Sequence, residues 1–296
     1  MLNPGFPKQF ESSEYILNNE LVKKVITNNS NFDTEEDRFD DVYTFEIWKK
    51  LECFNIKPES LSDLEVLDIC AGSGFLSYHI LKNSKPKKIT LLDISQKEIN
   101  HAKVILSEKY PDLSIEYVLA DFLNSEHKKQ YDLIIGNSFL HHFYNLPDAL
   151  LKIKSMLKPG GIFVALHEPT IASFALESRN PLALIKHIIY GKNYIELFRK
   201  IYSVSPHGVV GGDVWMFTIE DLKKMFKNAA FIDIDCRPCN LFRSIIVAYS
   251  SFVPGCKFIK LKLLKLSIIF DQIIYKFLPE KFFGSTVSFV KKDIIK

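Results

Sequence analysis

The stretch Glu65–Ser77, EVLDICAGSGFLS, decides how the rest of the chain is organised. Its apolar part, Val66–Ile69, predicts a buried strand, and Gly72 and Gly74 predict a turn that leads into a helix. Glycine reaches positive φ without a penalty and leaves space where a side chain would collide with a ligand. The N-terminus of the following helix offers free N–H groups and a positive partial charge. The stretch is therefore typical of a turn that binds a nucleoside.

Strand-like and helix-like segments alternate from this stretch to the end of the chain. Short apolar runs predict strands at Glu65–Ile69, Lys88–Asp93, Ser114–Ala120, Tyr131–Gly136, Ile162–His167, Phe231–Arg237 and Gly284–Lys291. Helical spacing predicts helices at Gly74–Asn83, Ser95–Tyr110, Leu146–Leu157, Thr218–Asn228 and across most of Leu241–Leu278. Repeated strand–helix units with short loops bury both faces of a parallel sheet. We therefore predict an α/β fold with a Rossmann-like, seven-stranded, mostly parallel sheet and helices on both faces.

The N-terminal region, residues 1–63, lacks this alternation. Helical spacing at Glu14–Ile26 and Asp41–Phe54 predicts a helical cap instead. The cap either packs on the main domain, residues 64–296, or acts as a lid that closes over the ligands. The aromatic side chains available to a lid are Tyr43, Phe45 and Trp48.

Two later segments have features of their own. Residues 169–217 form a long insertion after the fifth strand, and long connections of this kind often carry substrate specificity. Residues 257–278 are apolar and basic, with lysines at Lys257, Lys260, Lys262 and Lys265. A basic amphipathic helix can lie on an anionic membrane surface. The alternative is a helix packed on the sheet edge with a solvated lysine face.

Composition narrows the class of protein. The chain has 296 residues, 47% of them hydrophobic and 25% charged, as in a soluble globular protein. A net charge of +3 is too small to indicate a nucleic-acid partner. Five scattered cysteines indicate reduced thiols and a cytoplasmic location, and Cys236-x-x-Cys239 lacks the second pair that a metal site needs. The N-terminus shows no signal pattern and no apolar run suits a transmembrane helix.

Acidic residues lie at or near the ends of three of the predicted strands. Asp93 ends the second strand, 25 residues after Asp68, and Asp121 follows the third. Ligands of open α/β sheets lie outside the carboxyl ends of the strands, so these side chains are expected at the site. Asp93 can accept both hydroxyls of a ribose, and Asp121 can accept from an adenine amine while Ile94 or Phe122 packs on the ring. Each aspartate, taken alone, is as well explained as a turn or helix cap.

In order and spacing, these motifs resemble those of class I S-adenosylmethionine (SAM) methyltransferases. Motif I of that family is an acidic residue followed by G-x-G-x-G, and Cys70 replaces its first glycine here. The later elements YDLIIGNSFLHHF and LKPGGIFVALHEP also match. The resemblance implies SAM as the cofactor, an antiparallel last strand and small-molecule acceptors such as quinone rings or natural products. It implies a cofactor site made by Asp68, Cys70, Ala71, Gly72, Gly74, Asp93, Ile94, Asp121, Phe122, Asn137 and Ser138.

Acceptor-side residues are less well defined. Methylation of a phenol or alcohol needs a general base, and histidine and carboxylate side chains are suited to that role. His167 and Glu168 follow the fifth strand, His142 lies after the fourth, and His207 lies in the insertion. We predict these four as the catalytic candidates, although each histidine is also explained by packing or hydrogen bonding.

Alternative functions stay open at this point. The fourth strand lacks the [D/N]-P-P-[Y/F] motif of base and glutamine N-methyltransferases, which argues against that chemistry. Methylation of an RNA or a protein predicts a continuous basic groove beside the cofactor. A SAM-binding protein without turnover predicts no polar group near the methyl. An NAD enzyme predicts a third glycine, and Ser77 occupies that position.

Overall fold

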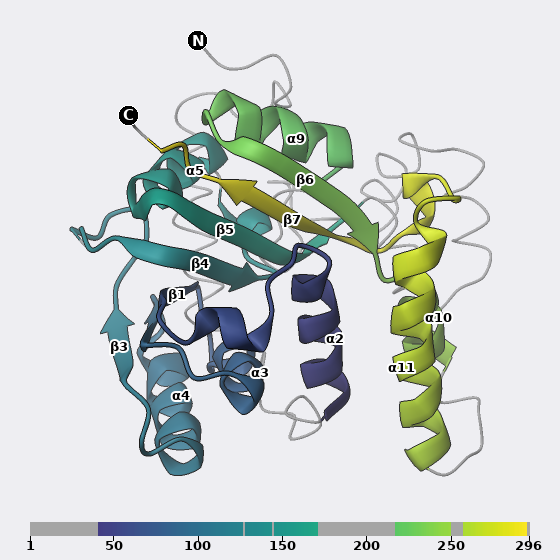
Figure 1. Cartoon of the computed structure of the whole chain (residues 1–296), viewed down its shortest axis with the longest axis horizontal. Coiled ribbons are helices and arrows are strands. Elements are labelled where there is room, and N and C mark those ends of the chain that lie inside the picture. Colours follow the sequence, from purple (N-terminus) through teal and green to yellow (C-terminus); the bar gives the residue numbers. More distant parts are fainter. Residues whose placement is uncertain (1–40, 127, 144, 171–216, 250–256, 295–296) are drawn as a thin grey trace, which may run out of the picture.

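A seven-stranded sheet forms the centre of the computed structural model, which describes residues 41–126, 128–143, 145–170, 217–249 and 257–294 (Figure 1). The strand order is β3-β2-β1-β4-β5-β7-β6. The strands are β1 Glu65–Ile69, β2 Lys88–Asp93, β3 Ile115–Leu119, β4 Tyr131–Asn137, β5 Leu157–Pro169, β6 Ile232–Cys239 and β7 Ser285–Lys291. The first five strands pair in parallel, and β7 is antiparallel to both β5 and β6. The predicted fold class and its antiparallel last strand are therefore confirmed.

Helices cover both faces of this sheet because residues along the inner strands are apolar on both sides. Val66 and Ile135 pack into one core with α2 (Asp41–Glu52), α3 (Phe75–Asn83) and α4 (Gln96–Lys109). Leu67 and Ile134 point to the other face and pack with α5 (Leu146–Ser155) and α9 (Ile219–Asn228). Full burial of one such side chain stabilises the fold by about 1.5–3 kcal/mol. The remaining helical segments are α10 Phe242–Tyr249, α11 Lys257–Ile274, and the 3-10 turns η2 Pro58–Leu61, η3 Leu140–His142 and η5 Glu280–Phe282.

Local signals set most element boundaries. Ser95 precedes α4, and its Oγ accepts a hydrogen bond from the Glu98 N–H at 3.4 Å. Thr218 and Asp221 form a reciprocal capping box at the start of α9. The largest error in a predicted strand boundary is at β5, which begins at Leu157 rather than Ile162. The other strand boundaries differ from the prediction by two residues or fewer. Leu157 already pairs with Tyr131, and the register shifts before the next pair.

The predicted helix at 41–54 is present as α2 and lies against α3 and α11 (Figure 1). Trp48 Nε1 donates to the carbonyl of His79 at 3.1 Å, and Thr44 Oγ1 lies 2.8 Å from His79 Nδ1. The first predicted helix, Glu14–Ile26, lies outside the described residues. So do residues 171–216, which include most of the insertion and His207.

Candidate active site

Asp68 lies in the protein interior, one residue before the end of β1. Its side chain is fully buried, and its Oδ2 accepts from the N–H and the Oγ of Ser77 at 3.1 and 2.6 Å. Ser77 occupies the position of the third glycine in a dinucleotide motif. Its hydrogen bonds to Asp68 join α3 to β1. Burial raises the pKa of Asp68 to about 7, against the lowering effect of the two bonds from Ser77.

The two glycines of this turn serve different purposes. Both have the left-handed backbone that favours glycine, with φ of 52° at Gly72 and 79° at Gly74. The N–H of Gly72 donates to Asp93 Oδ2 at 2.8 Å, which links the turn to the end of β2. A Cβ on Gly74 would lie 3.1 Å from Ala102 Cβ and Leu106 Cδ1, both on α4. Gly74 therefore allows α3 and α4 to approach closely, whereas Gly72 shapes the turn itself.

The carboxylates at the ends of β2 and β3 are held by backbone and side-chain donors. Asp93 Oδ1 accepts from the N–H of Ser95 at 2.8 Å. Asp121 accepts from the N–H of Leu123 at 3.1 Å and from Asn124 Nδ2 at 2.8 Å. Each carboxylate offers about four acceptor positions, so a group held in this way can also accept from a ligand hydroxyl or amine.

The other predicted cofactor residues at these strand ends are apolar. The N–H of Ala71 donates to Leu92 at 3.1 Å, and Ile94 is half-buried beside Asp93. Phe122 is buried, with its ring centroid 5.7 Å from that of Phe143. Ile94 is thus the more accessible of the two side chains predicted to pack on a ring.

Three neighbouring strands carry a non-glycine residue in the left-handed conformation at the same edge of the sheet. The φ angles are 53° at Cys70, 57° at Ser138 and 57° at His167. Cys70 and Ser138 directly follow β1 and β4, and His167 lies two residues before the end of β5. These three strands are adjacent in the sheet. Cys70 thus has a backbone conformation that favours glycine, the residue that motif I carries at this position. Such residues cost about 1–3 kcal/mol each and cluster at functional sites, which supports this edge as the site.

Glu168 organises the segment that follows β4. Its side chain is fully buried, and its oxygens accept from the N–H groups of Phe139, Leu140 and His141 at 2.9, 3.0 and 3.2 Å. The same carboxylate lies 2.8 Å from His141 Nδ1. Despite its burial, the pKa of Glu168 is lowered by His141 and by these backbone donors. These contacts favour a positioning role for Glu168 over the general base expected from the sequence.

The two histidines of η3 lie together. The ring centroids of His141 and His142 are 4.0 Å apart, and His142 is half-buried whereas His141 is buried. Because Glu168 contacts Nδ1 of His141, it orients that ring in the way that a carboxylate orients a catalytic histidine. His142 is the more accessible of the pair at this edge of the sheet.

His167 belongs to a buried polar cluster that joins β5 to α2. It lies in a register shift of β5 between Ala165 and Glu168. Its Nε2 is 2.8 Å from Glu46 Oε1 and contacts Lys50 Nζ, and its Nδ1 is 2.5 Å from Asn137 Oδ1. The predicted cofactor residue Asn137 and the predicted catalytic residue His167 are therefore brought together.

Two cations and one carboxylate form the charged part of this cluster. Glu46 is fully buried and accepts from Lys50 Nζ at 2.6 Å and from Arg243 Nε at 2.6 Å. Although burial works in the opposite direction, Arg243 and Lys50 hold the pKa of Glu46 well below its ordinary value. Burial and the charge of Lys50 lower the pKa of His167 to about 4. His167 is therefore neutral near pH 7, and an Nδ1–H tautomer would donate to Asn137 and accept from Lys50 through Nε2.

Glu46, Lys50 and Arg243 were not predicted from the sequence. The signal available was the four-residue spacing of Glu46 and Lys50 within FEIWKKLE. That spacing is common on solvated helix faces, where it stabilises the helix by a few tenths of a kcal/mol. Sequence alone therefore did not separate a buried ion cluster from a surface pair.

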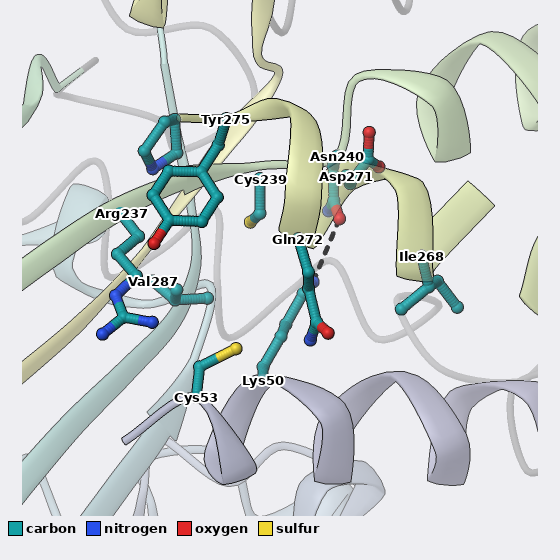
Figure 2. Close-up of a pocket in the computed structure, with 11 residues that line it drawn as sticks. Lys50, Cys53, Arg237, Cys239, Asn240, Ile268, Asp271, Gln272, Tyr275 and Val287 are labelled. Atoms are coloured by element: carbon teal, nitrogen blue, oxygen red, sulfur yellow. Dashed lines mark hydrogen bonds between the residues drawn. The ribbon is translucent and has the colours of Figure 1, made fainter. Parts of the chain in front are cut away.

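A pocket lies on the other side of Lys50, between α2, the end of β6 and α11 (Figure 2). Figure 2 shows Lys50 reaching toward Asn240, whose Oδ1 accepts from Nζ at 3.0 Å. The pocket is lined by Lys50, Cys53, Arg237, Pro238, Cys239, Asn240, Ile268, Asp271, Gln272, Tyr275 and Val287. These lining residues include no predicted cofactor or catalytic residue, so the pocket belongs to the packing of α2 against α11.

Comparison with known proteins identifies the family. Residues 60–230, more than half of the chain, match the family described as a methyltransferase domain. The chain belongs to this family, and its motif I, sheet order and antiparallel last strand are those of class I SAM-dependent methyltransferases.

Individual curated relatives share 30% identity or less with part of this chain. Demethylmenaquinone methyltransferase from Leptospira interrogans is 30% identical over 139 residues, 44% of this chain and 54% of that protein. Ubiquinone biosynthesis O-methyltransferase from Rickettsia bellii is 27% identical over 104 residues, 35% of this chain and 42% of that protein. The chain thus spans about half the length, or less, of these curated relatives.

The fold is also that of a solved methyltransferase. The structure of phosphoethanolamine N-methyltransferase 2 from Haemonchus contortus, in complex with S-adenosyl-L-methionine, has a TM-score of 0.54 and 13% identity. The match covers 97% of this chain and 61% of that chain. This likeness shows a shared fold.

Proposed function

We propose that this protein binds SAM at the carboxyl ends of β1, β2 and β3 and catalyses methyl transfer to a small-molecule acceptor. The observation that carries the proposal is the placement of Asp68, Asp93 and Asp121 at one edge of three adjacent strands. In a chain of the methyltransferase family, this edge offers acceptors for the hydroxyl and amine groups of the cofactor.

The residues of this edge fit such a ligand. In the part of the chain that the structure describes, Asp68 Oδ1 and Ser73 Oγ are buried without a hydrogen-bond partner. Buried polar atoms are normally paired, so two such atoms beside the turn support a polar ligand there. Asp93 would hold the ribose, Asp121 the adenine amine and Ile94 the face of the ring.

When bound, SAM supplies a sulfonium-activated methyl group. The protein must then hold the acceptor in line with that methyl, and orientation of this kind can lower a barrier by about 7–11 kcal/mol. His142 and His167 would lie on the acceptor side, and the more accessible His142 would accept a proton from an acceptor hydroxyl. His167 would act by positioning, since both of its ring nitrogens already contact Asn137, Lys50 or Glu46. Glu168 and His141 would position the η3 segment that carries His142.

Calorimetric titration with SAM, S-adenosylhomocysteine and NAD tests the cofactor. We expect micromolar binding of the first two ligands and none of NAD. Asp93→Asn should weaken SAM binding at least tenfold, because it replaces a charged acceptor worth about 1.5–3 kcal/mol per bond. Asp112→Asn, at an exposed position before β3, is the matched control and should leave binding unchanged. Equal affinities for both variants would remove the ribose role of Asp93, and binding of NAD alone would refute the proposal.

The acceptor class is part of the same proposal. The relatives named for demethylmenaquinone and ubiquinone biosynthesis support a small-molecule acceptor rather than an RNA or a protein. The described cysteines carry free thiols, in keeping with the cytoplasmic location that we include in the proposal. A screen of quinone, phenol and amine acceptors, read by formation of S-adenosylhomocysteine, would identify the class. Tight SAM binding with no turnover on any acceptor would favour a non-catalytic SAM-binding protein.

A further inference from the structure

Helix α11 exposes apolar side chains and buries polar ones. Ser267 and Asp271 are buried, and Asp271 accepts from the N–H groups of Phe242 and Arg243 at 2.8 and 3.3 Å. Gln272 Nε2 donates to the carbonyl of Lys49 at 2.7 Å. Together with the buried Ile268, these polar groups hold α11 against α10 and α2. An ordinary surface helix turns its polar residues to the solvent instead.

A continuous apolar stripe runs along the outward face of α11 and onto the turn that follows it. Its residues recur at intervals of three and four, and each is between 40% and 74% exposed. They are Leu263, Leu266, Phe270, Ile273 and Phe277. Phe242 on α10 extends the stripe, with its ring centroid 6.2 Å from that of Phe270. A contiguous exposed apolar patch of this kind marks an interaction surface.

The charges around the stripe are positive. The segment 257–278 contains five lysines and one acidic residue, and that residue is the buried Asp271. Lys262 and Lys276 are exposed beside the stripe, whereas Lys265 lies over the ring of Phe45 at 5.6 Å. Two copies of this face would bring like charges together, so the charge pattern disfavours self-association.

We propose that the α11 stripe docks the protein on an anionic phospholipid surface. Apolar side chains on one helical face would enter the boundary between headgroups and acyl chains, and the flanking lysines would contact the anionic headgroups. Among the described residues, no helix is long and apolar enough to cross a membrane, so the contact is with one surface. Figure 1 shows α11 at the periphery, with α2 between it and the central sheet.

Sedimentation with vesicles tests this docking on the full chain. We expect binding to vesicles of phosphatidylcholine mixed with phosphatidylglycerol, weaker binding at high salt, and little binding to phosphatidylcholine alone. The double variant Leu266→Ser/Phe270→Ser should bind at least tenfold more weakly, since two buried apolar side chains are lost. Lys262→Glu should weaken binding to the anionic vesicles only.

The matched control is Leu151→Ser/Val104→Ser, which removes two similarly exposed apolar side chains, on α5 and α4. It should bind vesicles like the wild type. If the α11 double variant misfolds, shown by lost SAM binding, Phe277→Ser alone replaces it, because this residue is 74% exposed beyond the helix end. Equal binding to both vesicle types, or wild-type binding by the α11 variants, would overturn the proposal. A wild-type dimer that the α11 variants dissociate would assign the stripe to a second copy instead.

Discussion

His167 Nε2 lies 2.8 Å from Glu46 Oε1, although 121 residues separate the two in the sequence. This contact joins the end of β5 to α2 and places the only carboxylate of the described cluster between His167 and two cations, Lys50 and Arg243. Glu46 therefore has two roles. It neutralises charges that folding removes from water, and it fixes α2 beside the proposed acceptor side of the site.

We predict that Glu46→Gln destabilises the protein by about 3–5 kcal/mol, because it leaves buried Lys50 and part-buried Arg243 without their anionic partner. Urea denaturation measures the change. Glu52→Gln is the matched control on the same helix, where the carboxylate pairs with Lys49 on the surface. It should change the free energy of unfolding by less than about 0.5 kcal/mol. Similar losses for both variants would show that the Glu46 cluster contributes no more than a surface pair.

The lowered pKa of His167 predicts a stability that depends on pH. The folded value of about 4 lies below the ordinary value of 6.5, so between these pH values the unfolded chain binds the proton and the folded protein does not. His167 therefore contributes up to about 3 kcal/mol to the free energy of unfolding above pH 6.5, and this contribution is lost as the pH falls to about 4. In His167→Gln that pH-dependent contribution should be missing. His101→Gln, on α4, should keep the wild-type profile, and an unchanged profile in His167→Gln would contradict the assignment.

The raised pKa of Asp68 should change the pH dependence of stability in the opposite direction. Its pKa of about 7 lies above the ordinary 3.8, so the folded protein holds a proton that the unfolded chain has released. Its contribution is complete below pH 3.8 and is lost as the pH rises through 7, by about 4 kcal/mol at most. Asp68→Asn should thus gain stability relative to the wild type between pH 5 and pH 8.

Differences between variant and wild type, measured by urea denaturation at each pH, separate this effect from that of His167. The control Asp112→Asn removes an exposed carboxylate. A constant difference between Asp68→Asn and the wild type across this range would show that Asp68 is already ionised at pH 5. Because Asp68 also belongs to the proposed site, the variant should bind SAM more weakly while being more stable at pH 8.

Gly74→Ala tests the close approach of α3 to α4. The new Cβ would lie 3.1 Å from atoms of Ala102 and Leu106, at a φ of 79°. Strain and crowding together should cost about 2–4 kcal/mol. Gly160→Ala has a similar φ of 75°, and its nearest atom is 3.4 Å away in Ile294, so strain alone should cost about 1–2 kcal/mol. Thermal and urea unfolding compare the two, and equal losses would show that crowding at Gly74 is relieved by its neighbours.

Much of the fold and part of the site followed from the sequence. All seven strands were predicted, six of them within two residues at each end, because apolar runs, capping residues and glycines act over short distances along the chain. The start of β5 was predicted five residues too late. The order of Asp68, Asp93 and Asp121 predicted a shared sheet edge, since parallel strands end on the same side. Cys70 was recognised as a substituted glycine position, and its φ of 53° agrees with that assignment.

Only the tertiary structure decided which charged and apolar groups are buried. The spacing of Glu46 and Lys50 is compatible with a solvated helix face. In the fold, both side chains are buried in a cluster with His167, which comes from a strand far along the chain. Likewise, the periodicity of α11 predicts an apolar face but not the side on which it lies. Asp271 and Gln272 bond to α10 and α2, and this turns Leu266 and Phe270 outward. Local sequence sets the elements, whereas burial depends on partners that are distant in sequence and that only the folded chain brings together.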